Sequence, residues 1–137
     1  MRTVILAALL LFAGCSSGLV YKPAPAEKLD PAKTARLTGS VEPWGLYFTA
    51  VTQADGESVR VIVLSEIGLK LLDFSAAPDG AEVYYKFDKL PDAAAGAFIR
   101  FARHELRTPC PAKTLSFTDP RTRAHFETAA QGGTQCR

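Results

Sequence analysis

The segment "WGLYFTAVTQADGESVRVIVLS" (residues 44–65) decides the fold, because it contains two alternating runs separated by a turn signal. Over residues 44–51 and 59–65, successive side chains fall on opposite faces with a period of two, which is typical of a β-strand. Between these runs lies Asp55-Gly56, a pair that favours a tight hairpin. We therefore predict an antiparallel hairpin at this point of the chain.

Two further strands are predicted downstream of this hairpin, over residues 69–76 and 81–87. The turn between them, "APDG", has Pro at its second position and Gly at its fourth. Four short strands joined by tight turns form an antiparallel meander. A fifth strand is predicted over residues 113–117, and a short second helix over residues 119–130 with Asp119 as its N-cap.

Residues 90–107 have the pattern of an amphipathic helix. Pro91 suits the first turn, Asp92 suits the positive end of the helix dipole, and the segment is rich in alanine. The apolar side of this helix is expected to cover one face of the meander. The predicted fold class is therefore α+β, a small curved antiparallel sheet of four to five strands packed against one or two helices.

Residues 1–14 have the features of an export signal. Arg2 is followed by an apolar run to Phe12, far shorter than the about 20 apolar residues of a membrane-spanning helix. The run ends in Ala13-Gly14-Cys15, which resembles the lipobox of bacterial lipoproteins. The resemblance implies that Cys15 is acylated and anchors the mature chain to a membrane. The alternative is an ordinary signal peptide followed by a chance cysteine.

The anchor determines the predicted organisation of the chain. Residues 1–14 form the signal peptide, residues 15–43 a proline-containing tether, and residues 44–137 a single domain. The residue after the anchor is Ser16 rather than Asp, which by analogy with enteric bacteria favours sorting to the outer membrane. We therefore expect a cell-envelope protein anchored at the outer membrane and facing the periplasm.

Few residues carry a signal for covalent or metal chemistry. In an oxidising compartment Cys110 and Cys136 are expected to form a disulfide, worth roughly 3.5 kcal/mol in the chain-entropy model. No metal site, cofactor or catalytic residue is predicted, because the cysteines lack CxxC spacing and no G-x-S-x-G, P-loop or H-E-x-x-H motif occurs. His104 and His125 have the pattern of surface residues. Asp73, inside an apolar strand, is a candidate buried carboxylate.

The charge distribution is uneven along the chain. A formal net charge of +2 argues against general nucleic-acid binding, yet from Arg100 onward seven basic residues accompany three acidic ones. Arg100, Arg103 and Arg107 fall on the polar side of the predicted helix. This basic face is either a solvated surface or a site for anionic lipid or for a partner protein.

The aromatic and aliphatic side chains of the sheet and helix form the other candidate site. They either pack as a closed core or line the concave side of a curved sheet that accepts an acyl chain. An acyl chain requires little specific polarity, so both interpretations fit the same pattern. The candidate ligand face comprises Trp44, Leu46, Phe48, Ile62, Leu64, Leu72, Phe74, Phe98 and Phe101.

The segment "VRVIVLSEIGLKLLDFSAAPDG" (residues 59–80) contains a strand ending in Leu-Ser, a turn with Gly68, an apolar strand and a turn with Pro-Asp-Gly. This order resembles a segment of the LolA/LolB-like half-barrel lipoproteins, the family of the outer-membrane lipoprotein receptor, over about residues 44–106. The resemblance implies a curved antiparallel sheet wrapped around helices, with a hydrophobic cavity for acyl chains. The chain is shorter than the full sheet of that family requires, and it ends in a cysteine pair.

Together these patterns favour a non-enzymatic cell-envelope lipoprotein that binds acyl chains or a lipidated partner on a curved sheet. The alternative is an interaction or assembly module whose basic helix face binds another envelope protein. A third class is an accessory subunit of an enzyme. No oligomeric state is predicted.

Overall fold

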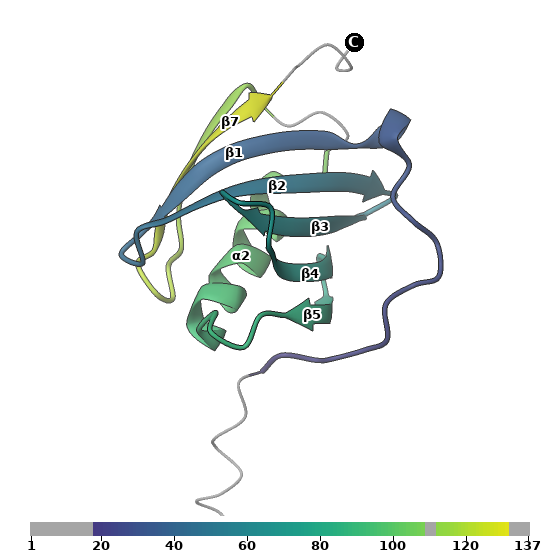
Figure 1. The fold of residues 1–137 in the computed structure, drawn as a ribbon, viewed down its shortest axis with the longest axis horizontal. Coiled ribbons are helices and arrows are strands. Elements are labelled where there is room, and N and C mark those ends of the chain that lie inside the picture. The colour runs from purple at the N-terminus through teal and green to yellow at the C-terminus, as the bar shows by residue number, and fades with distance from the viewer. Residues whose placement is uncertain (1–17, 109–111, 132–137) are drawn as a thin grey trace, which may run out of the picture.

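The computed structural model describes residues 18–108 and 112–131, which fold into one antiparallel sheet curved around a helix (Figure 1). The strands are β1 (Ala35–Glu42), β2 (Leu46–Asp55), β3 (Ser58–Ser65), β4 (Lys70–Ala77), β5 (Gly80–Lys86), β6 (Thr114–Thr118) and β7 (His125–Gln131). Their order across the sheet is β5-β4-β3-β2-β1-β7-β6. The helices are α2 (Asp92–Glu105) and the short 3-10 helix η1 (Pro31–Lys33).

The predicted fold class is wrong about the size of the sheet. Instead of four to five strands with one or two helices, the described residues form a seven-stranded sheet with one α-helix. Residues 119–130, predicted as a second helix, form a turn followed by β7. The side chain of Asp119 accepts a hydrogen bond from the Thr122 amide at 3.1 Å. The short side chain of Asp suits a turn as well as a helix N-cap, which explains the error.

The other missed strand is β1, which lies inside the segment predicted as a tether. It pairs with β2 on one side and with β7 on the other, so the sheet begins at Ala35 rather than at Trp44. Leu37 and Val41 are fully buried, but Gly39 and small polar residues separate them. Such a weakly apolar strand is stabilised by its neighbours rather than by its own propensity.

The predicted meander and first helix are present. In the β2–β3 hairpin Asp55 is paired with Ser58, and Gly56 adopts a positive φ of 63°. The strand predicted over residues 113–117 is β6, and the helix predicted over residues 90–107 is α2. The meander and α2 carry strong local signals, which is why the sequence pattern locates them.

The core lies between the concave face of the sheet and α2. Phe98 of α2 packs edge-to-face against Phe48 of β2 and Phe126 of β7, with ring centroids 4.9 and 5.1 Å apart. Phe101 stacks on Phe126 at 4.8 Å. These four rings are at most 3% exposed. Aromatic packing between the helix and distant strands therefore closes the sheet around α2.

The chain before β1 lies along the domain instead of extending away from it (Figure 1). The amide of Lys22 donates to the Val83 carbonyl at 2.9 Å, and the Val83 amide donates to the Val20 carbonyl at 2.8 Å. Farther along, the Asp30 amide donates to the side chain of Gln53 at 2.8 Å. The expected tether is thus partly docked on the sheet.

Several predictions concern residues that the structure does not describe. The signal peptide (residues 1–14), the anchor Cys15 and the disulfide between Cys110 and Cys136 lie outside the described residues. Within residues 18–108 and 112–131, no helix has the length and apolar character needed to cross a membrane.

Candidate functional site

The predicted apolar ligand face is divided between the two sides of the sheet. Ala50 is paired with Val63, and both are buried toward α2, whereas the neighbouring pair of Val51 and Ile62 points to the other side. Ile62 and Leu64 therefore lie on the outer face. Trp44 and Leu46 are partly buried against the core. The remaining members are buried in the core: Phe48, Leu72, Phe74, Phe98 and Phe101.

This division removes the basis for a single acyl-chain groove on the helix-facing side. The register between strands decides which side chains share a face. A shift of one residue in the register moves all apolar side chains of a strand to the opposite face of the sheet. The alternation of side chains along the sequence does not specify that register. Among the predicted ligand-face residues, those on the concave side are packed against one another and against α2.

A groove of about 620 Å³ lies instead on the outer face, where β1, β2 and β7 adjoin. We call it the outer groove. Alternate positions of these strands supply hydroxyl groups, while the turn after β3 and strand β7 each supply a carboxylate. The side chains that define its chemistry are Thr38, Ser40, Tyr47, Thr49, Glu66 and Glu127.

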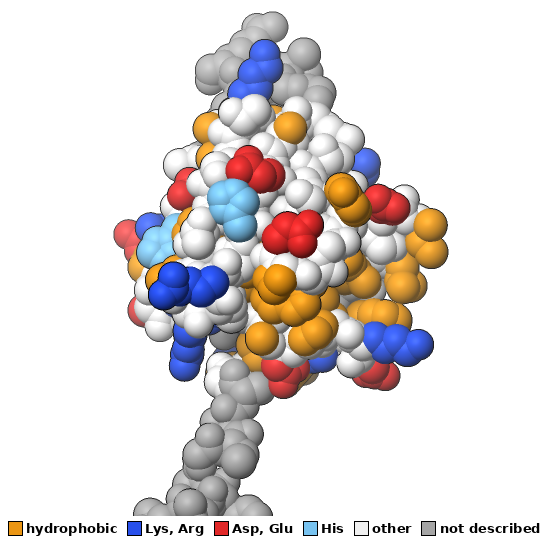
Figure 2. Space-filling view, turned by 90° about the vertical axis from the view of Figure 1, so that its left-hand side faces the viewer, with side chains coloured by type: hydrophobic (Ala, Val, Ile, Leu, Met, Phe, Trp, Pro, Cys, Tyr) orange, Lys and Arg blue, Asp and Glu red, His pale blue; other side chains and the backbone are white. Residues whose placement is uncertain are grey.

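The outer groove combines negative charge with an exposed aromatic ring. Its lining contains Glu66 and Glu127 but no Lys or Arg among the described residues. Tyr47 is 60% exposed, and Ile67 and Leu69, in the turn that carries Glu66, are 89% and 44% exposed. Figure 2, which views the molecule from the left-hand side of Figure 1, shows hydrophobic and acidic side chains interspersed on that side.

A hydrogen-bonded network at the β6–β7 pair holds the Glu127 carboxylate. Register places Thr118 opposite His125 and Ser116 opposite Glu127. The Nε2 atom of His125 lies 2.6 Å from Oε1 of Glu127, and the Ser116 hydroxyl donates to the same oxygen at 2.9 Å. Hydrogen bonds from His125, and then from Ser116, lower the pKa of Glu127 below its ordinary value. The carboxylate is therefore favoured in its charged form.

The sequence pattern predicts His125 as an isolated surface residue and does not reveal this network. The signal was present as S-x-T in one segment and H-x-E in another, with equal spacing. Only the β6–β7 register brings these residues together. The hydroxyl of Thr118 lies 2.8 Å from Nδ1 of His125, opposite the carboxylate on Nε2. This hydroxyl–imidazole–carboxylate order resembles the order of a catalytic triad.

The exposure of the network distinguishes it from a developed catalytic centre. The side chains of His125 and Glu127 are 42% and 60% exposed. Hydrogen bonding and charge act most strongly on a reacting group in a site from which water is excluded. At these exposures the arrangement is better suited to presenting an oriented carboxylate to a ligand in the outer groove.

The three arginines predicted as a partner face have different environments. Arg100 forms two hydrogen bonds to Asp119, from Nε at 2.6 Å and from Nη2 at 2.8 Å. Nε of Arg107 donates to the Arg103 carbonyl at 2.7 Å. Arg103 is half-buried, and its Nε atom has no hydrogen-bond partner among the described residues. The three arginines therefore do not form one continuous, freely solvated surface.

Asp119 is the fully buried partner of Arg100. Burial, the largest single effect, raises the pKa of this carboxyl, but hydrogen bonds from Arg100 and Thr122 and the Arg100 charge together outweigh it and lower the pKa to about 2. The ion pair therefore joins α2 to the turn before β7. Its role is structural, because both partners are engaged with each other.

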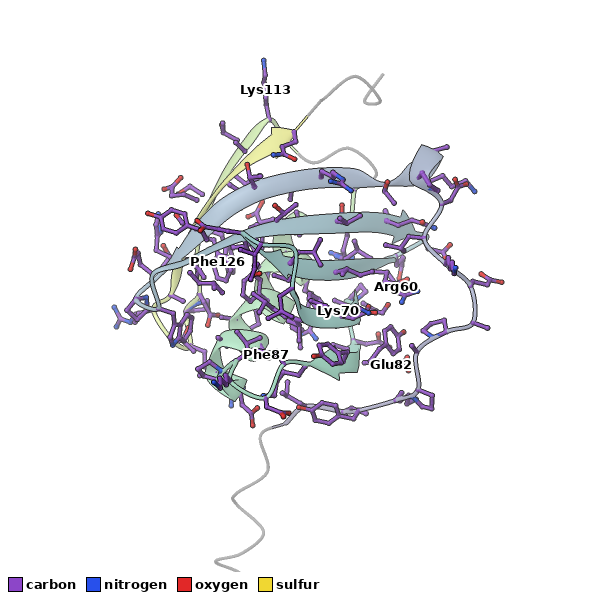
Figure 3. All side chains as sticks on the ribbon, in the orientation of Figure 1. Arg60, Lys70, Glu82, Phe87, Lys113 and Phe126 are labelled. Carbon is purple, nitrogen blue, oxygen red and sulfur yellow. The ribbon has the colours of Figure 1, made fainter. Side chains whose placement is uncertain are left out.

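The candidate buried carboxylate Asp73 also has a structural partner. Nε and Nη2 of Arg60 donate to its two oxygens at 3.2 and 3.0 Å, and Nζ of Lys70 lies 3.5 Å away. Nη1 of Arg60 donates to the Glu27 carbonyl at 3.1 Å, which connects the N-terminal segment to β3. Figure 3 labels Arg60 and Lys70, which lie near each other and both reach Asp73.

Within the described part of the chain, no three His, Cys, Asp or Glu side chains are grouped so that they could hold a metal ion. No protein-family model, curated protein or solved structure matches this chain. The resemblance to the LolA/LolB-like lipoproteins therefore stays a prediction.

Proposed function

We propose that this chain is a lipid-anchored protein of the cell envelope, attached through Cys15 to the outer membrane and facing the periplasm. We further propose that it acts as a non-enzymatic binding module. The signal-like residues 1–14 and the lipobox-like Ala13-Gly14-Cys15 support the anchor. The exposure of the His125–Glu127 network supports a binding rather than a catalytic role.

The ligand best supported by the geometry is a basic, extended segment of another envelope protein, bound in the outer groove. The observation that carries this proposal is the pair of carboxylates, Glu66 and Glu127, in a groove whose described lining has no basic side chain. Lys or Arg side chains of a partner would complement this charge. Exposed Tyr47 and Ile67 offer apolar contacts beside the carboxylates.

An acyl chain on the helix-facing side is the ligand that the packing supports least. Phe48 and Phe98 are in contact there with a centroid distance of 4.9 Å. A chain entering between the sheet and α2 would have to separate these rings and lose their packing. The proposal therefore concerns the outer face of the sheet.

The anchor is tested by the substitution Cys15→Ala in the full chain. Because the thiol is the proposed attachment point, the variant should leave the membrane fraction and lack acyl groups in its intact mass. Ser17→Ala is the matched control and should retain both properties. Continued membrane fractionation of an unacylated Cys15→Ala protein would contradict the proposed anchor.

The outer groove is tested with a fluorescently labelled peptide of alternating lysine and valine. The double variant Glu66→Gln, Glu127→Gln removes two negative charges from the groove and should raise the dissociation constant about tenfold in fluorescence anisotropy. Added salt should weaken binding to the unmodified chain. The double variant Glu57→Gln, Asp88→Asn removes two exposed negative charges outside the groove lining and should change binding little. Equal affinities of the two double variants would rule out the groove as the binding site.

A further inference from the structure

We propose that a second cavity, between α2, β5 and the N-terminal segment, binds the phosphate of an anionic phospholipid headgroup in the membrane that carries the anchor. We call it the basic cavity. The inference rests on the proposed function, because it takes acylated Cys15 as the attachment to that membrane. It assigns a ligand to part of the basic helix face, for which the sequence pattern fits either a solvated surface or a binding site.

The basic cavity has a volume of about 340 Å³ and is built from parts distant in sequence. One turn of α2 supplies Arg100 and Arg103, and the turn before β7 supplies Arg121. Apolar side chains from the N-terminal segment, from β5 and from α2 itself complete the wall. The residues on which the argument depends are Leu19, Val83, Ile99, Arg100, Arg103 and Arg121.

The cavity has an excess of positive charge. Asp119 compensates Arg100 through two hydrogen bonds, whereas the structure gives no ion pair to Arg103 or Arg121 within the described residues. No acidic side chain is among the described residues that line the cavity. A phosphate group would supply the missing negative charge, and guanidinium groups bind phosphate oxygens with favourable geometry.

Arg103 provides an independent indication of a missing acceptor. Its Nε atom is buried and has no hydrogen-bond partner among the described residues. A buried donor without a partner is unfavourable, and such groups are rare in folded proteins. An anionic oxygen in the basic cavity is the kind of acceptor that this guanidinium lacks.

Gly96 makes room for the Arg100 guanidinium at the wall of the cavity. A Cβ atom at this position would lie 3.2 Å from Nη1 of Arg100, so the absent side chain leaves room for the guanidinium to lie back along α2. From there it reaches Asp119 and still lines the cavity. The ion pair therefore orients the Arg100 guanidinium at the cavity wall, and Arg103 and Arg121 take no part in it.

The location of the cavity identifies a lipid as the source of the phosphate. Gly18 lines the cavity and follows Cys15 by three residues in the sequence. Three residues span at most about 10 Å even when fully extended. The headgroup layer of one leaflet is about 5–8 Å thick. An acylated Cys15 would therefore keep the basic cavity within reach of the headgroups.

The docking of the N-terminal segment maintains this short connection. The hydrogen bonds between Val20, Lys22 and Val83 hold the segment against β5. The first described residues lie beside β5 and α2 in Figure 1, at the cavity. Leu19, Val83 and Ile99 provide apolar contacts next to the arginines, which suits a molecule that has a phosphate beside its hydrocarbon chains.

The experiment uses the full acylated chain in a neutral detergent and measures the NMR signal of the Arg103 Nε–H group. The three probes are short-chain phosphatidylglycerol, short-chain phosphatidylcholine and inorganic phosphate. Phosphatidylglycerol should bind at least about tenfold more tightly than either other probe, because it combines net negative charge with apolar chains. The Arg103 signal should shift in proportion to the fraction of protein that has bound phosphatidylglycerol.

A charge-matched pair of variants locates the binding site. The variant Arg103→Gln, Arg121→Gln, followed through the Ile99 methyl signals, should weaken phosphatidylglycerol binding about tenfold. The variant Lys28→Gln, Arg36→Gln loses the same charge at exposed positions outside the cavity and should bind as the unmodified chain does. Equal weakening in both variants would mean nonspecific attraction and would overturn the proposal.

Two further outcomes would also overturn it. Equal affinity for phosphatidylglycerol and phosphatidylcholine would exclude recognition of an anionic headgroup. Inorganic phosphate bound as tightly as phosphatidylglycerol would identify a free-anion site instead of a lipid site. The intact mass of the same sample reports acylation of Cys15 separately. Failure of the anchor is therefore distinguishable from failure of the cavity to bind lipid.

Discussion

Asp119 connects two parts of the molecule through a single side chain. Its carboxylate has no solvent exposure, accepts two hydrogen bonds from Arg100 and accepts another from the Thr122 amide. Its backbone amide donates to the Ala124 carbonyl at 2.8 Å. The residue therefore fixes the turn before β7 against α2 in the charged state.

This environment predicts a specific loss of stability in acid. The folded-state pKa of about 2 lies below the ordinary value of 3.8 for an aspartate, so the charged carboxylate stabilises the fold fully above about pH 4. As the pH falls from 4 to 2, the folded chain should lose about 2 kcal/mol from this group. Urea unfolding at a series of pH values measures the loss.

The substitution Asp119→Asn should remove this acid-dependent part and lower the free energy of unfolding at pH 7 by about 3 kcal/mol, because Arg100 is left without its charged partner. Asp88→Asn is the control, since Asp88 is exposed in the loop after β5 and has no ion pair with another described residue. Similar stabilities for the two variants at pH 7 would show that the Asp119 pair contributes little.

At the scale of elements, β1 determines how the sheet is completed. It joins the meander of β2–β5 to the β6–β7 pair, and without it those two parts would not share a sheet. Gly39, near its middle, permits close packing of three strands. A Cβ atom there would lie 2.5 Å from the Glu127 carbonyl oxygen and 2.7 Å from Cγ2 of Thr128.

We expect Gly39→Ala to destabilise the protein by about 1–3 kcal/mol, because the clash involves a backbone atom of β7 that cannot rotate away. Thermal and urea unfolding would measure the change. Gly80→Ala is the matched control, since a Cβ atom at Gly80 meets no atom of the described residues within 4 Å. A Gly39→Ala variant as stable as Gly80→Ala would show that β1 and β7 are less closely packed than described.

The local patterns explain why some elements were predictable. The strands β2 to β5 have alternation and turn residues within short segments, and α2 has a 14-residue amphipathic pattern. β1 and β7 lack such patterns, because small and polar residues occupy many of their positions. Their strand conformation depends on pairing with partners far away in sequence.

At the scale of the whole molecule, the N-terminal segment covers one edge of the sheet. The segment from Val20 to Lys22 runs parallel to β5 and forms hydrogen bonds with both the amide and the carbonyl of Val83. An uncovered edge strand can pair with other chains, so this contact also protects the sheet from edge-to-edge association. The ion pair of Lys22 with Glu82, at 3.0 Å, lies at the same edge.

Hydrogen exchange of the full chain tests this docking. The amides of Lys22 and Val83 should exchange at least about tenfold more slowly than unprotected amides of the same sequence, because each is hydrogen-bonded across the edge. The amide of Lys28, for which the described residues provide no hydrogen bond, is the internal comparison. Equal protection of Lys22 and Lys28 would mean that the segment does not stay on β5.

The sequence by itself determined the elements with strong local periodicity and predicted an anchored envelope protein, because these properties depend on neighbouring residues. Only the tertiary structure decided that Ile62 faces away from Phe98, that β1 belongs to the sheet, and that Ser116 lies opposite Glu127. It also brought Arg103 and Arg121 to one cavity. Register and long-range packing join residues that are far apart in the chain, and no local pattern encodes which of them meet.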